Sequence, residues 1–460
     1  MRIFDKKVKM PKDAIWLVPG LRVKRWFLLI VLSSVLAAIG VTFVFKLEPL
    51  YYIVDKAKDL FHMVPPEPVG VLLILIGAVL FIAAWKKTNF SMLLNDFDNM
   101  RTEQSIGEVL YRKMKLDHGP KIVAIGGGTG LSTLLRGIKK ITNNITAIVT
   151  VGDDGGSSGR LREQMGVLPP GDIRNCIAGL ADDDNIVTKL FQYRFKTGEG
   201  LEGHSFGNLF ITAMTAVCGD MVTAIRESSK VLLIRGRVLP ATCDDMKLYA
   251  KMEDDSIVKG ESNIPEAHKK IMQLCCEPED CKPAPDVIEA IKDADLIIMG
   301  PGSLYTSVIS NFLVKDITRA VWKSKAKKIY VCNAMTQPGE TDNYSVSDHV
   351  KTIFEHVRLD DIDDSNKNFF DAVLVNNSMP RNLAEKYEQA GSLPVDIDWG
   401  ELKKLGVEVV ERSLLEDNKE GLVRHNCVGV ARAIYAWYKR SMKKSDEKKH
   451  TENTAIQSGK

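Results

Sequence analysis

Hydrophobic positions between residues 121 and 440 fall into short runs that are apolar on both faces and are separated by segments of helical periodicity. Strands buried on both faces and alternating with helices are typical of a parallel sheet covered by helices on both sides. We therefore predict an α/β fold with a mostly parallel sheet. The expected strands are residues 121–125, 146–151, 231–234, 296–299, 328–332, 372–375 and 407–410.

One part of this domain departs from the alternating pattern. Residues 161–224 contain several helix starts, no convincing strand run and a high density of Gly, Asp and Asn. We predict that they form a helical insertion covering the crevice at the edge of the sheet. Residues 441–460, after the domain, are largely polar, a composition that is typical of a disordered tail.

Two longer apolar stretches precede the domain. Residues 26–45 and 69–85 contain no charged side chain, and at about 1.5 Å per residue both are long enough to be read as spans of a bilayer core of about 30 Å. A cleaved signal peptide would have a shorter apolar region, and charge-free runs of this length are rare in soluble hairpins. We therefore predict a transmembrane hairpin over residues 26–85, with Trp26 and Trp85 at the interfaces.

Lysine and arginine are concentrated next to these stretches. Residues 1–25 carry eight Lys or Arg against two acids, residues 86–115 carry six against four, and residues 46–68 carry three against four. By the positive-inside rule, both termini and the domain at 121–440 are cytoplasmic in a multi-pass protein of the cell membrane. Residues 86–120 then form a juxtamembrane connector. The formal net charge of +3 is too small to indicate nucleic-acid binding.

A glycine loop follows the first predicted strand. The sequence GGGTG, residues 126–130, leads directly into a helical pattern. Consecutive glycines allow a sharp turn, leave backbone N–H groups uncovered and direct the positive end of the next helix at an anion. The loop lacks the Lys of a Walker motif and the last Gly of a dinucleotide motif. A mononucleotide or nucleotide sugar therefore fits better than ATP hydrolysis or a nicotinamide cofactor, and a tight turn without a ligand is the alternative.

A second polar loop, GDDGGSSGR at residues 152–160, follows the next predicted strand. Loops that end successive parallel strands share one crevice. Adjacent carboxylates repel each other, so we expect Asp153 or Asp154 to turn away, toward a ribose hydroxyl or a hydrated Mg²⁺, while the glycines and serines donate to phosphate oxygens. Ordinary turn formation explains the same residues equally well.

Two more motifs stand at predicted helix starts. In LPPGDIRN, residues 168–175, Asp172 is either the N-cap or a ligand residue, and Arg174 lies in the first turn within reach of an anion. In GHSFGN, residues 203–208, His204 is a candidate for proton transfer or for phosphate binding.

The loops after the predicted strands at 296–299 and 328–332 complete the candidate site. The first, GPGSLYTS, offers a glycine turn, hydroxyl groups and Tyr305, whose ring suits stacking or a bond to a sugar. The second, NAMTQPGET, carries Asn333 and Gln337, whose amide groups suit the edge of a base. Because these polar loops all follow strands or precede helices in one domain, we predict that they form a single pocket.

The ordered motifs GGGTGLS, GDDGGSSGRLR, PPGDIRN, GHSFGN, GPGSLYTS and CNAMTQPGET resemble the gluconeogenesis factor family, relatives of 2-phospho-L-lactate transferase. The resemblance covers about residues 120–440 and implies a Rossmann-like fold. It also implies binding of UDP-sugars such as UDP-N-acetylglucosamine, with a role in cell-wall homeostasis and cell shape during growth on gluconeogenic carbon. The transferase branch moves a phospholactyl group from a guanosine diphosphate donor to a deazaflavin, with Mg²⁺.

The resemblance, applied motif by motif, implies that the glycine loop at 126–130 holds the diphosphate and that Asp153 and Asp154 lie beside it. It also implies that the loops after the predicted strands at 296–299 and 328–332 surround the sugar and the base. The expected nucleotide-sugar site comprises Gly126, Gly127, Gly128, Thr129, Gly130, Gly152, Asp153, Asp154, Ser157, Ser158, Asp172, Arg174, Asn175, His204, Asn208, Gly300, Gly302, Ser303, Tyr305, Thr306, Asn333, Thr336 and Gln337.

Two functions are consistent with this site. The first is a membrane-tethered UDP-sugar-binding regulator that requires no cofactor, forms a homo-oligomer and acts on proteins of envelope synthesis. The alternative is a Mg²⁺-dependent transferase in which Asp153, Asp154 or Asp172 binds the metal. The sequence offers only His204 and scattered carboxylates for chemistry, without a clear nucleophile and base, which favours binding.

Overall fold

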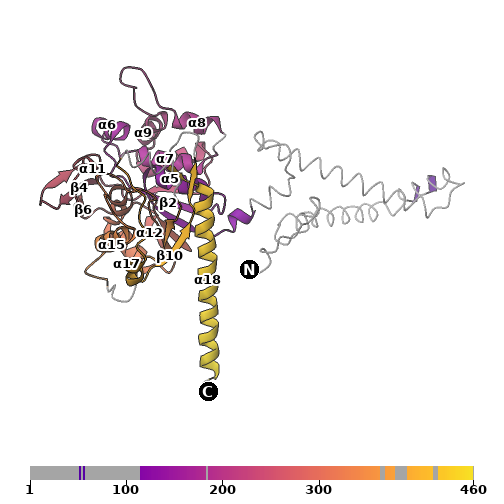
Figure 1. Cartoon of the computed structure of the whole chain (residues 1–460). Coiled ribbons are helices and arrows are strands. Elements are labelled where there is room, and N and C mark those ends of the chain that lie inside the picture. Colours follow the sequence, from indigo (N-terminus) through magenta and orange to yellow (C-terminus); the bar gives the residue numbers. More distant parts are fainter. Residues whose placement is uncertain are drawn as a thin grey trace. The chain divides into compact units, whose positions relative to one another are not determined.

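The computed structural model describes residues 51–52, 55–56, 114–182, 185–362, 368–378, 391–417 and 423–458 (Figure 1). The chain divides into two compact units, Met1–Lys115 and Leu116–Lys460. The spans expected at 26–45 and 69–85 lie outside the described residues. Within the described ranges, no helix combines the length and the apolar character needed to cross a bilayer.

A seven-stranded sheet forms the centre of the unit Leu116–Lys460, in the order β10-β9-β8-β7-β1-β2-β3, with every neighbouring pair parallel. Its strands are β1 (Ile122–Gly126), β2 (Ile145–Val149), β3 (Arg237–Pro240), β7 (Leu296–Met299), β8 (Lys327–Val331), β9 (Ala372–Asn376) and β10 (Glu408–Arg412). The predicted α/β fold with a mostly parallel sheet is confirmed.

The strand order reverses beside β1. The chain first adds β2 and β3 on one side of β1, and later adds β7, β8, β9 and β10 on the other side. Ligands of open α/β sheets bind outside the carboxyl ends of the strands at such a switch point. The gap between the ends of β1 and β7 is therefore where the fold alone places a ligand.

One predicted strand was wrong. Val231 is the last residue of the helix α10 (Met221–Val231), and the strand β3 begins only at Arg237. Leu233 is 78% exposed and has a φ of 51°, in the left-handed region. The apolar run at 231–234 thus ends a helix and forms a turn, and only part of it faces the core.

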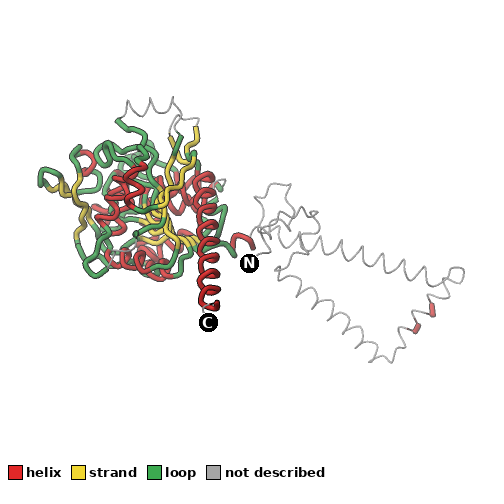
Figure 2. The backbone as a smooth tube through the Cα atoms, turned by 60° about the horizontal axis from the view of Figure 1, so that its bottom comes forward, coloured by secondary structure: helices red, strands yellow, loops and turns green. Residues whose placement is uncertain are grey.

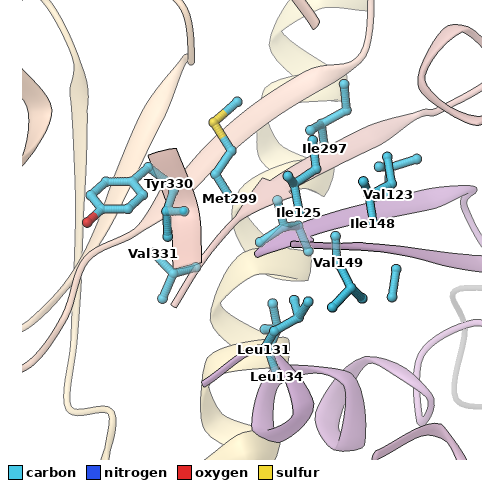
Figure 3. Packing of buried hydrophobic residues seen from close by; sticks show 14 of the residues in the cluster. Val123, Ile125, Leu131, Leu134, Ile148, Val149, Ile297, Met299, Tyr330 and Val331 are labelled. Atoms are coloured by element: carbon cyan, nitrogen blue, oxygen red, sulfur yellow. The ribbon is translucent and has the colours of Figure 1, made fainter. Parts of the chain in front are cut away.

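The sheet core is packed against the helix α5 (Gly128–Ile138). Leu131 and Leu134 of α5 lie below Ile125, Ile148 and the neighbouring strand residues, all of them almost fully buried (Figure 3). Further helices of the unit Leu116–Lys460 include α12 (Val287–Lys292), η2 (Leu304–Ile309), α13 (Ser310–Phe312), α14 (Lys315–Lys323), α15 (Val346–His356) and α17 (Trp399–Leu405).

The segment between β2 and β3 is helical, as its sequence indicates. It consists of α6 (Gly156–Met165), α7 (Gly171–Leu180), α8 (Ile186–Gln192), α9 (Phe206–Cys218) and α10, and its described residues contain one isolated bridge, Arg194 to Ser205, outside these helices. Because α7 packs against α5, β2 and β3, part of this insertion belongs to the layer beside the sheet and does not cover a crevice.

A small antiparallel sheet, which the sequence pattern did not reveal, lies to one side of the central sheet (Figure 2). Its strands β4 (Lys247–Met252), β5 (Ile257–Lys259) and β6 (Ile271–Glu277) have the order β5-β4-β6, and the short helix α11 (Asn263–Glu266) lies between β5 and β6 in the chain. A two-stranded ladder pairs β11 (Leu415–Asp417) with β12 (Val423–His425).

The last helix, α18 (Cys427–Ser458), packs its first part against α5 and extends away from the sheet (Figure 1). Trp437, 1% exposed, is buried against the core and donates to Glu408 Oε2 at 3.1 Å. The helix continues through residues 441–458, for which the composition predicts disorder.

Candidate functional site

The glycine loops after β1 and β7 touch each other at the switch point. A Cβ atom on Gly130 would lie 2.4 Å from the carbonyl oxygen of Pro301 and 3.1 Å from Gly302 Cα. A Cβ on Gly302 would lie 3.5 Å from the carbonyl oxygen of Gly127. Only glycine at position 130 allows this backbone contact, so the structure brings the glycine loops GGGTG and GPGS into direct contact.

The helix α5 begins at this contact without a cap. Gly127 is its extended N-cap, with φ −163°, and can offer no side chain, while Gly128 has φ +63°. The first turn contains no acidic residue. The positive end of the helix dipole therefore faces the switch point, where Asp172 of the helix α7 accepts a hydrogen bond from the backbone of Gly128.

Two further helices start at the same place. The N-caps of α6 and α7 are Gly155 and Pro170, and neither supplies a side-chain hydrogen bond. A Cβ on Gly171, the first residue of α7, would lie 2.3 Å from Ser158 Oγ in the first turn of α6. Three uncapped helix starts thus converge, which is an arrangement suited to a polyanion.

Asp172, in the first turn of α7, is not the N-cap. Its Oδ2 would lie 2.6 Å from a Cβ on Gly127, and its carboxylate accepts a hydrogen bond from the backbone of Gly128. Burial, together with the negative charge of Asp153, raises the pKa of Asp172 to about 7, although the bond from Gly128 works in the opposite direction. The structure therefore excludes the N-cap role, and the ligand role of Asp172 stays a prediction.

The paired aspartates do point apart. Asp154 accepts hydrogen bonds from Glu261 N at 2.8 Å, Ser262 N at 2.9 Å and Ser262 Oγ at 2.7 Å. Asp153 accepts from Gly155 N at 3.0 Å. Asp154 therefore anchors the turn between β5 and α11 and is directed neither at a sugar nor at a metal.

Glu261 is a site residue that the sequence analysis missed. The turn held by Asp154 places it near Asp153, Asp172 and Thr306. Burial, with the charges of Asp153, Asp154 and Asp172, raises the pKa of Glu261 to about 7, and a hydrogen bond with Thr306 opposes the rise. Nothing distinguishes this Glu from other surface acids in the sequence, because its position depends on a contact with a residue more than a hundred positions away.

Glu340 is a second missed acid, at the end of the motif after β8. It is 3% exposed and accepts from Thr306 Oγ1 at 2.9 Å and from Tyr305 N at 3.4 Å. Burial raises its pKa to about 7 against these hydrogen bonds. The hydroxyl of Thr306 is therefore occupied by a protein acceptor between two carboxyl groups.

The loops after β7 and β8 are cross-linked through their side chains. Ser303 Oγ donates to Gln337 Oε1 at 2.8 Å, and Gly302 N donates to Asn333 Oδ1 at 3.4 Å. Thr336 Oγ1 accepts from Leu393 N at 2.8 Å. These amide and hydroxyl groups order the loops, which leaves fewer of them for a base than the sequence suggested.

Tyr305 lies away from the expected pocket. It is 1% exposed, its hydroxyl donates to Ile271 O at 3.2 Å and it is hydrogen-bonded to Tyr344 at 2.8 Å. The helix η2, a π-helical turn, carries the ring into the core beside the small sheet. Its face is not available for stacking on a ligand in this structure.

His204 and its neighbours form a basic wall beside α6 and α7. Burial and the nearby charges of Arg160 and Arg194 lower the pKa of His204. Arg174, which donates to Asn175 Oδ1 at 2.7 Å, has its pKa lowered by burial and by Arg194, against the attraction of Asp172 and Asp153. Arg174 thus lies close enough to Asp172 and Asp153 to interact with both carboxyl groups.

The three aspartates named for the transferase alternative do not converge on one point, because Asp154 is hydrogen-bonded to the turn before α11, whereas the Asp172 carboxylate lies beside Gly127. Within the part of the chain that the structure describes, no group of three or more His, Cys, Asp or Glu is arranged to hold a metal ion.

Thr129, another residue of the predicted site, is exposed at the rim of the glycine loop.

A separate cavity of about 340 Å³ lies at the amino ends of the central strands, whereas the predicted motifs follow their carboxyl ends. It is lined by the amino ends of β1 and β2 and by Lys121, Arg237 and Asp293. Lys121 Nζ is 3.1 Å from Asp293 Oδ2. None of the predicted motifs reaches this cavity, so it provides a reference position against which the switch-point site can be tested.

Comparison with known proteins agrees with the order of the motifs. The family model described as 2-phospho-L-lactate transferase CofD matches residues 122–415. A Nostoc sp. relative is 47% identical over 427 residues, 92% of each chain. The Bacillus subtilis protein named gluconeogenesis factor is 50% identical over 313 residues, 68% of this chain and 96% of its own. A crystal structure of a Bacillus halodurans protein has TM-score 0.66 at 45% identity and covers 69% of this chain and 99% of that one.

Proposed function

This chain belongs to the gluconeogenesis factor family, relatives of 2-phospho-L-lactate transferase, and we propose that it is a membrane-anchored regulator whose cytoplasmic domain binds a UDP-sugar such as UDP-N-acetylglucosamine. In this proposal the bound precursor reports the state of cell-wall synthesis, and the protein passes the signal to envelope-synthesis proteins under gluconeogenic growth. The apolar stretches at 26–45 and 69–85 supply the anchor.

The observation that carries the proposal is the convergence of three uncapped helix starts on two touching glycine loops. The N-cap residues of α5, α6 and α7 supply no side-chain hydrogen bond, and the amide of Gly128 donates to Asp172. A diphosphate carries negative charge on both phosphates and accepts several such bonds at once. The nearby carboxyl groups favour this further, because raised pKa values leave Asp172 and Glu261 partly protonated at neutral pH, able to donate to phosphate oxygens.

The substitution Gly128→Asp tests the role of the first loop. A carboxylate there would stand against the phosphates, and like charges in contact cost several kcal/mol, so we expect affinity for UDP-N-acetylglucosamine to fall at least ~100-fold. Isothermal titration calorimetry on the full-length protein measures it.

The matched control is Gly166→Asp. Gly166 has the same φ of 63° and open space around a Cβ, but it ends α6 at the far side from the site. It reproduces the backbone strain and the added charge without the contact. Equal affinity of the Gly128→Asp variant and the wild type would remove the first loop from the site, and equal losses in both variants would show a general effect on folding.

A further inference from the structure

A buried serine and histidine share a hydrogen bond beside the helix starts. Ser157 Oγ lies 2.9 Å from His204 Nδ1, and Asn208 Nδ2 donates to Ser157 Oγ at 3.0 Å. The three side chains are 5%, 4% and 2% exposed. They come from α6, the loop before α9 and α9 itself, so the fold assembles a cluster that no single motif contains.

The hydrogen-bond pattern gives the serine proton a direction. Because the amide of Asn208 donates to a lone pair of Ser157 Oγ, the serine hydrogen is free to point at His204 Nδ1. Arg160 and Arg194 disfavour a charged imidazole at this position. A neutral imidazole that accepts a hydroxyl proton is the arrangement of a nucleophile with its general base.

The position of Ser157 suits a nucleophile. It lies in the first turn of α6 within the pattern Gly-x-Ser-x-Gly, residues 155–159, after a parallel strand. A Cβ on Gly159 would lie 1.9 Å from the carbonyl oxygen of Asp154, so the turn is too tight for another residue. The uncapped amides of the same turn can stabilise charge that develops on a phosphoryl oxygen.

The histidine is held by the backbone on both sides. Phe195 N donates to His204 O at 2.9 Å, and His204 N donates to Leu201 O at 3.0 Å. Arg160 Nη2 donates to Glu202 O at 2.8 Å, and Arg194 donates to the carbonyl of Gly203. This loop fixes the ring against α6 before any ligand arrives, which is the preorganisation that a catalytic base requires.

We propose that Ser157 and His204 hydrolyse the diphosphate link of the bound nucleotide sugar, an activity that rests on the proposed function and goes beyond sensing. Ser157 Oγ bonds to one phosphorus as the bridging P–O bond breaks, the departing phosphate monoester keeps the electron pair, and the serine proton moves to His204 Nδ1. Water then attacks the same phosphorus, His204 returns its proton to Oγ as the P–Oγ bond breaks, and the second water proton enters solvent. UDP-N-acetylglucosamine and one water become UMP and the sugar 1-phosphate.

The experiment uses full-length protein and UDP-N-acetylglucosamine with ³²P in both phosphates. Binding is measured by calorimetry, UMP by chromatography, and covalent label by acid quenching and gel electrophoresis. We expect wild type to release UMP and to carry label, at a rate that is constant near pH 7–8 and falls in acid below the ordinary histidine pKa of about 6.5. Ser157→Ala should carry no label, and its UMP release should be at least ~100-fold slower.

His204→Gln separates catalysis from structure, because its amide oxygen still accepts the bond from Ser157 but cannot take the proton. We expect the same ~100-fold loss of rate in this variant. Ser229→Ala is the control, since Ser229 donates only to Ile225 O within α10, and it should match wild type. Circular dichroism confirms that each variant is folded.

The outcomes are distinct. Wild type that does not bind the nucleotide would contradict the proposed function itself. Binding without UMP or label would leave the regulator intact and overturn the hydrolytic pair. Release of UDP, or UMP release that is as fast in Ser157→Ala as in wild type, would also overturn it.

Discussion

At the scale of single residues, the site contains carboxyl groups whose burial disfavours the charged form. Asp172, Glu261 and Glu340 each have a pKa raised to about 7, with burial as the largest cause. Such groups favour the folded state when protonated, so their contribution is fully present below the unfolded pKa values near 4 and is lost as pH rises to about 7. The unliganded protein should therefore lose stability over that interval.

Asp172→Asn isolates one of these groups. Because the amide cannot ionise, the variant should gain stability relative to wild type by roughly 4 kcal/mol more at pH 8 than at pH 4. Urea unfolding at the two pH values measures the difference. A gain in Asp172→Asn that is the same at both pH values would show that Asp172 does not titrate as proposed.

At the scale of elements, the loops of β1 and β7 work as one unit because Gly130 lets their backbones touch. Asp154, in the loop after β2, accepts a hydrogen bond from the backbone of Glu261 in the turn between β5 and α11. This bond brings Glu261 into the site. The sequence shows each of the first three loops as polar and glycine-rich, but it does not show which side chains serve as anchors. Asp154, expected at the ligand, is an example of a residue used for assembly.

Gly130→Ala tests the contact between the two loops. The new Cβ would meet Pro301 O at 2.4 Å, and relief of such a clash requires a backbone shift that typically costs about 1–3 kcal/mol. We expect lower stability by thermal or urea unfolding, with weaker nucleotide binding.

Gly400→Ala, in α17, provides the control for the glycine substitution itself. Nothing lies within 4 Å of a Cβ there, and alanine in a helix is favoured over glycine by roughly 0.5–1 kcal/mol. This variant should be unchanged or more stable. A Gly130→Ala protein as stable as Gly400→Ala would mean that the two loops are not in contact.

At the scale of the whole molecule, the central sheet was predictable and its periphery was not. Strands such as 296–299 are apolar on both faces and flanked by helices, a pattern that specifies a buried parallel strand. The strand β4 has only alternating burial, and β5 is three residues long, so the small sheet left little trace in the sequence. The Ser157–His204 pair was also missed, because 47 positions separate its members.

The proposed function requires that the switch point between β1 and β7 binds a diphosphate. The most direct measurement is a crystal structure of the protein grown with UDP-N-acetylglucosamine. We expect diphosphate density against the amides of residues 127–130 and the first turns of α6 and α7. Density instead in the cavity beside Lys121 and Arg237, at the amino ends of the strands, would contradict the proposed function.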